Sequence, residues 1–163
     1  MKTEQLSIQS GVKKYGEEGK KLALTEMKNL AVKNDCFKEV DYATLTEEMK
    51  NKALPLLMFM MMKQNGVLKS RGVANGSSQR IYTDKNEVSL PTPDFYSLKY
   101  VCTVAVKEGR DTGTLDLLSF FLQTEANEDD EPIVVKFTGA LALLLVKCDP
   151  TRWKKHLRRE NSK

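Results

Sequence analysis

Hydrophobic residues recur at helical spacing in two stretches of the chain, residues 19–33 and residues 95–108. Apolar positions three and four residues apart form one face of an α-helix, so both stretches are predicted to be helical. Asp94 stands at the N-cap position of the second helix. Its predicted inward positions are Phe95, Leu98, Val101, Cys102 and Ala105. Residues 1–18 are polar and interrupted by glycines, and they are expected to begin as a loose arm.

The strand-like pattern is clearest between the two helices. Residues 55–63 are apolar and short, Asn65-Gly66 is a type I′ turn signal, and residues 67–74 alternate. We therefore predict a β-hairpin, with its methionine-rich strand in the core rather than in a cofactor site. Alternation places Lys69 and Arg71 on one face, together with Val67 and Val73. Two cations on one face indicate an anion site, and they are equally typical of an exposed edge that lysine protects from aggregation.

The remaining pattern completes an α+β domain. Residues 44–47 form a capping box before a short polar helix, and residues 132–137 are predicted to be a strand. Periodicity does not distinguish helix from strand for residues 140–146. Asp149-Pro150 begins a basic helix over residues 151–161, which is equally consistent with binding a phosphate backbone or with ending the domain. We predict one domain over residues 19–163, with the hairpin in a small mixed or antiparallel sheet packed on helices.

One stretch, residues 109–124, contains the residue best placed for chemistry. Gly109 and Gly113 supply turn positions, and Thr114-Leu115 is predicted to be a buried lead-in strand. Asp116 follows at the strand exit, where sheets of this class place their chemistry and where a carboxylate can hold a metal ion. The alternative is that Asp116 caps the helical turn that follows. The acidic run 125–131 has no calcium-loop spacing, so we do not interpret it as a metal site.

The composition of the chain bears on its partners and on its cellular compartment. The 163 residues carry a net charge of +4, which favours a nucleic-acid partner only slightly. Three cysteines, an odd number without metal-ligand spacing, predict reduced thiols in an intracellular compartment, cytoplasmic or nuclear. The N-terminus has no apolar signal core, and the longest apolar runs are too short to span a bilayer, so no membrane association is expected.

The sequence around Asp116, Leu-Asp-Leu-Leu-Ser-Phe-Phe-Leu-Gln, resembles the first catalytic motif of the copia-type reverse transcriptases. In that family an aspartate ends a hydrophobic strand and an aromatic follows five residues later, as Phe121 does here. Residues 65–76 resemble the family's fingers hairpin, whose second strand has the pattern Lys-x-Arg-x-Val-Ala-x-Gly. Pro91-Thr-Pro93 and the helix after it keep the family's order, and the resemblance extends over residues 7–161.

The resemblance implies nucleotidyl transfer, in which a primer 3′-hydroxyl attacks a deoxynucleotide between two magnesium ions. It implies that Asp116 binds the Mg²⁺ ions and that the Leu117 carbonyl assists with one of them. Phe121 would exclude a 2′-hydroxyl, and Lys69 and Arg71 would grip the triphosphate. The residues expected at the backbone of an RNA template and a DNA primer are Arg80, Lys85, Arg152, Lys155 and Arg159.

The chain departs from the family at one decisive place. The second catalytic motif, an aromatic, any residue and two aspartates, has no match after Phe121, and Asp129-Asp130 comes too early in a charged loop. We therefore expect a fragment or remnant of a larger polyprotein, the fingers and first palm segment, which binds no magnesium and is inactive by itself. The alternatives are a non-catalytic nucleic-acid-binding module and an α+β interaction domain with no nucleic-acid role.

Overall fold

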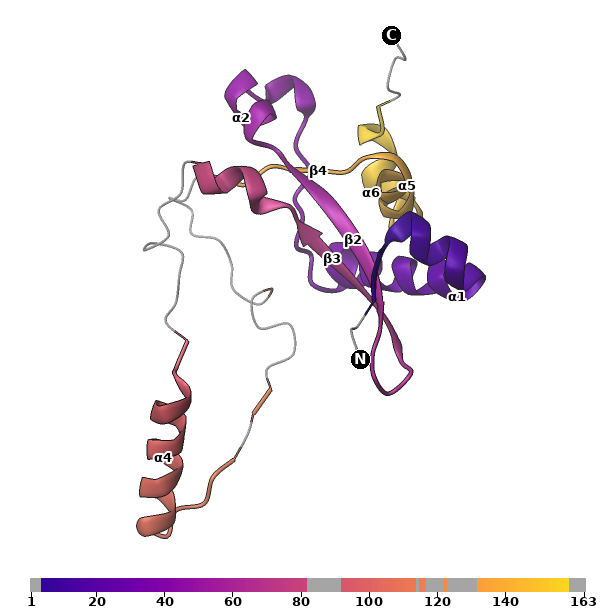
Figure 1. Ribbon diagram of the computed structural model, residues 1–163. Helices are drawn as coiled ribbons and strands as arrows, with labels where there is room; N and C mark the ends of the chain where they lie inside the picture. The colour runs from indigo at the N-terminus through magenta and orange to yellow at the C-terminus, as the bar shows by residue number, and fades with distance from the viewer. Residues whose placement is uncertain (1–3, 82–91, 114, 117–121, 123–131, 159–163) are drawn as a thin grey trace. The chain divides into compact units, whose positions relative to one another are not determined.

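A computed structural model describes residues 4–81, 92–113, 115–116, 122 and 132–158 of the chain. The chain divides into two compact units (Figure 1). The first comprises Met1–Gln79 with Glu125–Lys163, and the second comprises Arg80–Thr124. The described residues contain helices and a small mixed sheet, so the prediction of an α+β fold is confirmed. A single domain over residues 19–163 stays a prediction.

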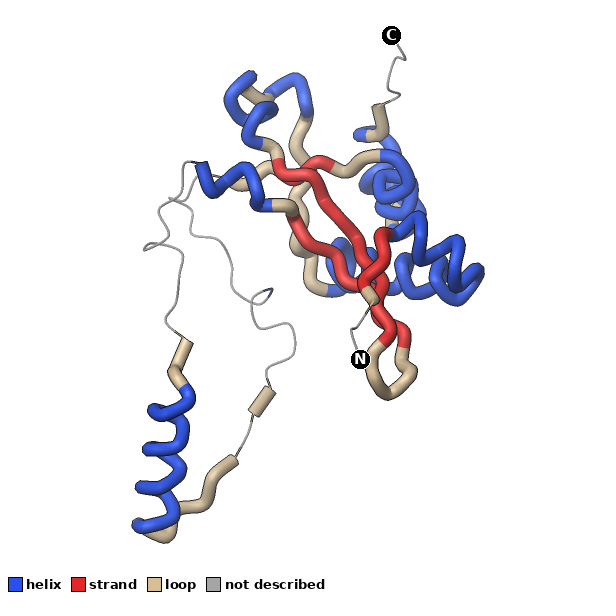
Figure 2. Tube along the Cα trace, in the orientation of Figure 1, coloured by secondary structure: helices blue, strands red, loops and turns tan. Residues whose placement is uncertain are grey.

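The sheet of the first unit is built around one long strand, β2 (Leu54–Met62). β1 (Gln5–Ser7) and β3 (Leu68–Ala74) both pair with β2 in antiparallel orientation. The short β4 (Val135–Lys136) pairs in parallel with the other end of β2, where Leu54 lies opposite Val135. Figure 2 shows these strands in red, with β3 last in the sheet on its side.

The predicted hairpin is confirmed, but its turn is not of type I′, because Gly66 has a positive φ and Asn65 does not. The amide of Lys63 donates to the carbonyl of Val67 at 2.9 Å, and the amide of Gly66 donates to that of Lys63 at 3.0 Å. Gly66 has a φ of 77°, in the left-handed region that glycine adopts at no steric cost. The turn thus sets the register in which Arg71 lies opposite Phe59 and Lys69 opposite Met61.

α1 (Ile8–Lys28) packs against the inner face of the sheet, and Ser7 caps its N-terminus by accepting from the Ser10 amide. The strand β2 alternates between buried and more exposed residues, and Met60, at 0% exposure, fits directly against α1. Contributions to the same core come from α5 (Gly139–Cys148) and α6 (Pro150–Trp153). The methionine-rich run therefore supplies core residues, as predicted.

Several sequence expectations for the first unit need correction. The prediction that the chain begins as a loose arm was wrong for the described residues 5–18, which form β1 and the first half of α1. The basic helix is shorter than predicted: after α6 a 3₁₀ turn, Lys154–His156, ends the helical segment. The open choice for residues 140–146 is settled as helix, within α5. Short elements at the end of the chain form only where tertiary packing supports them, because an isolated helical turn is unstable in water.

The second unit contains α4 (Phe95–Lys107), capped as predicted by Asp94, whose carboxylate accepts from the Ser97 amide at 2.8 Å. Only Ala105 of the predicted inward residues is buried. Phe95, Leu98, Val101 and Cys102 are exposed, so that part of the prediction was wrong for the described structure. The helix itself forms where the pattern placed it, because its cap and spacing are local properties.

Candidate functional site

Lys69 and Arg71 stand side by side on the outer face of the sheet, the face opposite α1. Residues of β3 alternate, so that Leu68 points into the core while Lys69 and Arg71 are exposed. The turn at Gly66 and the pairing with β2 place the two cations one pleat apart on the same face. A separation of about 7 Å between their Cα atoms follows from strand geometry. The predicted pairing of these two residues on one face is confirmed.

Neither Lys69 nor Arg71 has a charged or hydrogen-bonding partner for its side chain within the described residues. No ion pair or hydrogen bond of the Lys69 ammonium or of the Arg71 guanidinium occurs with any described side chain. Several other basic groups of the first unit differ in this respect: Lys14, Lys20 and Lys50 all pair with glutamates. The outer face therefore presents two solvated positive charges whose donors remain available to an anion.

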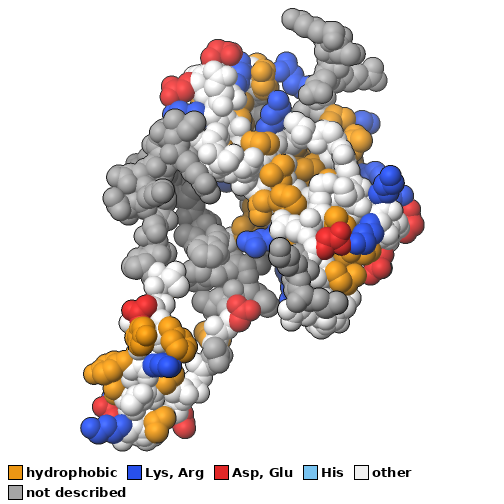
Figure 3. All heavy atoms as spheres, in the orientation of Figure 1, with side chains coloured by type: hydrophobic (Ala, Val, Ile, Leu, Met, Phe, Trp, Pro, Cys, Tyr) orange, Lys and Arg blue, Asp and Glu red, His pale blue; other side chains and the backbone are white. Residues whose placement is uncertain are grey.

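An apolar row runs beside these cations. The β2 residues on the outer face are Leu57, Phe59 and Met61, which pair with Val73, Arg71 and Lys69. Phe59 and Met61 are half-buried, and Leu57 is exposed. Figure 3 shows hydrophobic side chains gathered over β2 and β3, with a basic side chain beside them. Sequence reasoning missed this row, because every residue of β2 is apolar and the strand itself does not reveal which face is buried.

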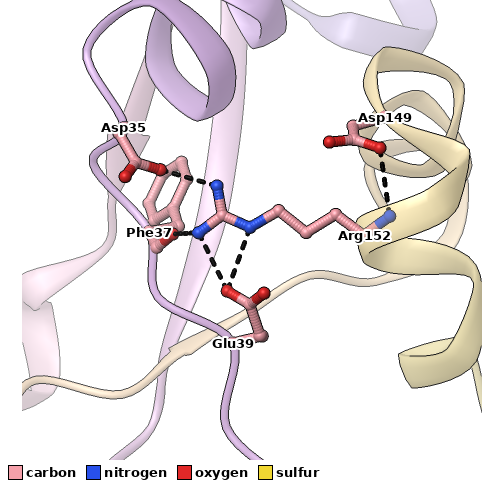
Figure 4. Close-up of polar contacts among 5 residues, drawn as sticks. All are labelled: Asp35, Phe37, Glu39, Asp149 and Arg152. Atoms are coloured by element: carbon pink, nitrogen blue, oxygen red, sulfur yellow. Dashed lines mark hydrogen bonds and ion pairs between the residues drawn. The ribbon is translucent and has the colours of Figure 1, made fainter.

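Arg152 has a different role from the one predicted. Its guanidinium donates to the Asp35 carboxylate at 2.6 Å, to the Phe37 carbonyl at 2.6 Å and, through Nε, to Glu39 at 2.9 Å (Figure 4). Its amide donates to Asp149, the N-cap of α6. These contacts fasten α6 to the loop over residues 35–39. Arg152 therefore stabilises the fold, and we withdraw it from the residues expected to contact a nucleic-acid backbone.

The electrostatics of this cluster agree with its geometry. Hydrogen bonding to Glu39 and Asp35 raises the pKa of Arg152, and hydrogen bonding to Arg152 lowers the pKa of Glu39. The guanidinium also lies 4.6 Å from the ring centroid of Trp153, which is buried in the core. Cation, carboxylates and ring thus form one structural cluster with its charges largely compensated.

The other predicted site residues are dispersed. Lys155 is exposed in the 3₁₀ turn after α6, and Arg80 belongs to the 3₁₀ helix Gly76–Ile81. Lys85, Leu117, Phe121 and Arg159 lie outside the described residues. Of the predicted set, the structure brings together Lys69 and Arg71.

Asp116 does not occupy the predicted strand exit in the described structure. Leu115 is 83% exposed, and neither it nor Asp116 belongs to a helix or strand. The predicted buried lead-in was therefore wrong at Leu115. Asp116 is exposed and belongs to the second unit, whereas Lys69 and Arg71 belong to the first. Among the described residues, no three His, Cys, Asp or Glu side chains form a group that could hold a metal ion.

Comparison with known proteins found no matching family model, no matching curated protein and no matching solved structure. Across the described residues, no helix combines the length and the apolar content that crossing a membrane requires.

Proposed function

We propose that this chain is the fingers and first palm segment of a copia-type RNA-directed DNA polymerase, and that its cationic hairpin binds phosphate groups. The observation that carries the proposal is the exposed, unengaged pair Lys69 and Arg71 on one face of the β2–β3 hairpin. The ordered sequence resemblance over residues 7–161 supports the assignment to this polymerase family.

The two cations have complementary chemistry toward phosphate. The planar guanidinium of Arg71 presents parallel N–H groups that match two oxygens of one phosphate, whereas the Lys69 ammonium acts as a mobile point charge. Both side chains are long and start from the same face of β3, so they can converge on one polyphosphate or span neighbouring phosphates of a strand. The hairpin turn and the pairing with β2 hold the Cα atoms of Lys69 and Arg71 in place. Binding phosphate therefore costs less conformational entropy, because only the two side chains have to become ordered.

The described residues do not make up a two-metal site. Magnesium, when bound in the family enzyme, supplies the charge that stabilises the attacking and leaving oxygens. Asp116 would be its ligand here, but among the described residues it belongs to no group of three or more His, Cys, Asp or Glu side chains that could hold a metal ion. We therefore derive no catalytic step, and the proposal assigns this chain phosphate binding through Lys69 and Arg71.

A second candidate is a non-catalytic module that binds single-stranded nucleic acid. The observation that favours it is the apolar row beside the cations, because a half-buried aromatic such as Phe59 on the outer face offers a surface on which a base can stack. A triphosphate site needs only the cations, whereas a strand platform needs the aromatic as well. Phe59→Ala therefore distinguishes the two functions.

Fluorescence anisotropy with a labelled single-stranded RNA tests the shared premise. If Lys69 and Arg71 each neutralise one phosphate, Lys69→Ala/Arg71→Ala makes the slope of log affinity against log salt shallower by about 1.4. The weakening of affinity between about 50 and 200 mM salt then becomes ~7-fold smaller than in the unaltered protein. The matched control is Lys13→Ala/Lys21→Ala, which removes two exposed lysines from α1 on the other face of the sheet.

The outcomes separate the candidate functions. Displacement of the RNA by excess deoxynucleoside triphosphate supports a polymerase-type triphosphate site. Loss of binding in Phe59→Ala, without displacement by the triphosphate, supports the strand-binding module instead. Equal losses in the control and test variants, or no binding at low salt, would contradict both and leave an interaction domain without a nucleic-acid role.

A further inference from the structure

A side chain from α1 forms a hydrogen bond with the edge of β3 that faces away from β2. Hydrogen bonds from Asn75 to Pro55 and from Lys63 to Val67 show that odd-numbered residues of the hairpin's second strand face β2. The backbone N–H and C=O groups of the even-numbered residues therefore point away from β2. They belong to Leu68, Ser70, Gly72 and Ala74, and we call them the outer edge of β3.

Within the described residues no strand pairs with this edge, because β3 is the last strand in the order β1-β2-β3 (Figure 2). One of its donors is nevertheless satisfied: the Gly72 amide donates to the Glu26 carboxylate at 3.1 Å. Glu26 is half-buried on α1, and 46 residues of chain separate it from Gly72. An unpaired strand edge is a template for pairing with another chain, and a charged group turned onto it is one way in which proteins prevent this.

Two further features belong to the same arrangement. A Cβ atom at Gly72 would lie 2.6 Å from Cδ1 of Leu30, so glycine allows the π-helical segment Asn29–Lys33 to lie close against the inner face of β3 at this residue. Lys69 and Arg71 precede Gly72 along the strand, and two copies paired through β3 would bring these cations near one another. Such like-charge approach disfavours pairing.

We propose that Glu26 is an edge guard: by holding the Gly72 amide, it prevents two copies of this chain from pairing through the outer edge of β3. The carboxylate occupies the donor that a second strand would need at the middle of the ladder. A second copy must displace a charge-assisted hydrogen bond before its own carbonyl can reach Gly72. This role is independent of phosphate binding, which uses side chains on the outer face.

Analytical ultracentrifugation over a concentration series tests the proposal on the full chain. Glu26→Ala should raise the dimerisation constant about tenfold or more, because a charge-assisted hydrogen bond no longer competes with strand pairing. Association of this variant should strengthen with salt, which screens the repulsion between Lys69 and Arg71 of the two copies. Glu18→Ala is the matched control, since Glu18 is exposed on the same helix.

The double variant Glu26→Ala/Ser70→Pro identifies the surface involved. The backbone N–H of Ser70 points to the outer edge, so proline there removes a donor of that edge without removing a backbone hydrogen bond to β2. It also removes the long hydrogen bond, 3.4 Å, from Ser70 Oγ to the Phe59 carbonyl. This variant should be as monomeric as the unaltered chain. Glu26→Gln keeps an acceptor oxygen and should associate less than Glu26→Ala. Dimerisation of the unaltered chain that Ser70→Pro abolishes, or an unchanged constant in Glu26→Ala, would overturn the proposal.

Amide exchange in the unaltered protein provides a test that survives misfolding of any variant. NMR-detected exchange should be at least about tenfold slower at Gly72 than at Ser70 and Ala74, because within the described structure only Gly72 of these three donates a hydrogen bond through its backbone amide. Equal exchange rates at the three amides would show that Glu26 does not hold the edge.

Discussion

Replacing Gly11 with alanine tests how closely α1 packs on the inner face of the sheet. A Cβ atom at Gly11 would lie 2.5 Å from Sδ, 2.9 Å from Cγ and 3.0 Å from Cβ of Met60. Met60 is fully buried, so its side chain cannot move into solvent to relieve the contact. The substitution therefore forces α1 away from β2, the strand that carries the hairpin register.

The expected cost is the difference between two opposing effects. Overpacking a core position costs about 1–3 kcal/mol, and the close approach to three Met60 atoms places Gly11→Ala toward the upper end. Alanine also favours the helix over glycine by about 1 kcal/mol. The free energy of unfolding should fall by about 1–2 kcal/mol, which corresponds to a decrease of about 2–8 °C in Tm.

A double-mutant cycle isolates the contact, with urea unfolding followed by circular dichroism as the measurement. Met60→Ala alone should cost about 2–5 kcal/mol because it leaves a cavity. In the Met60→Ala background, Gly11→Ala should cost nearly nothing, because Sδ and Cγ are gone and the helix preference remains. The coupling energy between the two sites should therefore be about 1–2 kcal/mol.

Gly16→Ala is the matched control on the same helix. Gly16 has φ 56° and ψ −128° at a kink in α1, and a Cβ there would meet nothing within 4 Å. Alanine at this position should cost about 1–2 kcal/mol through backbone strain, with or without Met60. If Gly11→Ala costs the same in both backgrounds, as Gly16→Ala should, contact with Met60 is not the cause and the packing argument fails.

Two further predictions concern the Arg152 cluster and catalysis. Hydrogen bonding to Arg152 lowers the pKa of Glu39 in the native chain. As the pH falls, Glu39 is therefore protonated in the unfolded chain, near its ordinary pKa of 4.5, at a higher pH than in the native chain. The stability that this pair supplies is thus present above that pH and is lost on acidification. The free energy of unfolding should therefore fall less steeply with acidification in Arg152→Gln than in the unaltered chain, as urea midpoints at neutral and acid pH would show; equal slopes would contradict this role. In a primer-extension assay on a poly-rA template with magnesium or manganese, we expect no incorporation, because the chain has no second catalytic motif. Asp116→Asn should leave the thermal unfolding curve unchanged, because Asp116 is exposed, and extension that this substitution abolished would contradict the prediction of an inactive chain.

The elements that the sequence determined by itself depend on neighbours close in the chain. The Asp94 cap of α4 and the Asp149 cap of α6 formed as predicted, and the hairpin turns at Asn65-Gly66 as predicted, although not as a type I′ turn. Each depends on hydrogen bonds that span only a few residues, or on the freedom of one glycine to adopt a positive φ. Alternation along β3 similarly placed Lys69 and Arg71 on one face before any fold was known.

Tertiary structure alone decided which partners meet across long separations. In β2 every residue is apolar, so only contact with α1 and α5 determines that Met60 faces the core and Phe59 the outer face. Arg152 looked like one basic residue among several, until the fold placed it against Asp35 and Glu39, more than a hundred residues away in sequence. Local periodicity contains no information about such partners, because they are selected by packing and charge compensation after the chain has folded back on itself.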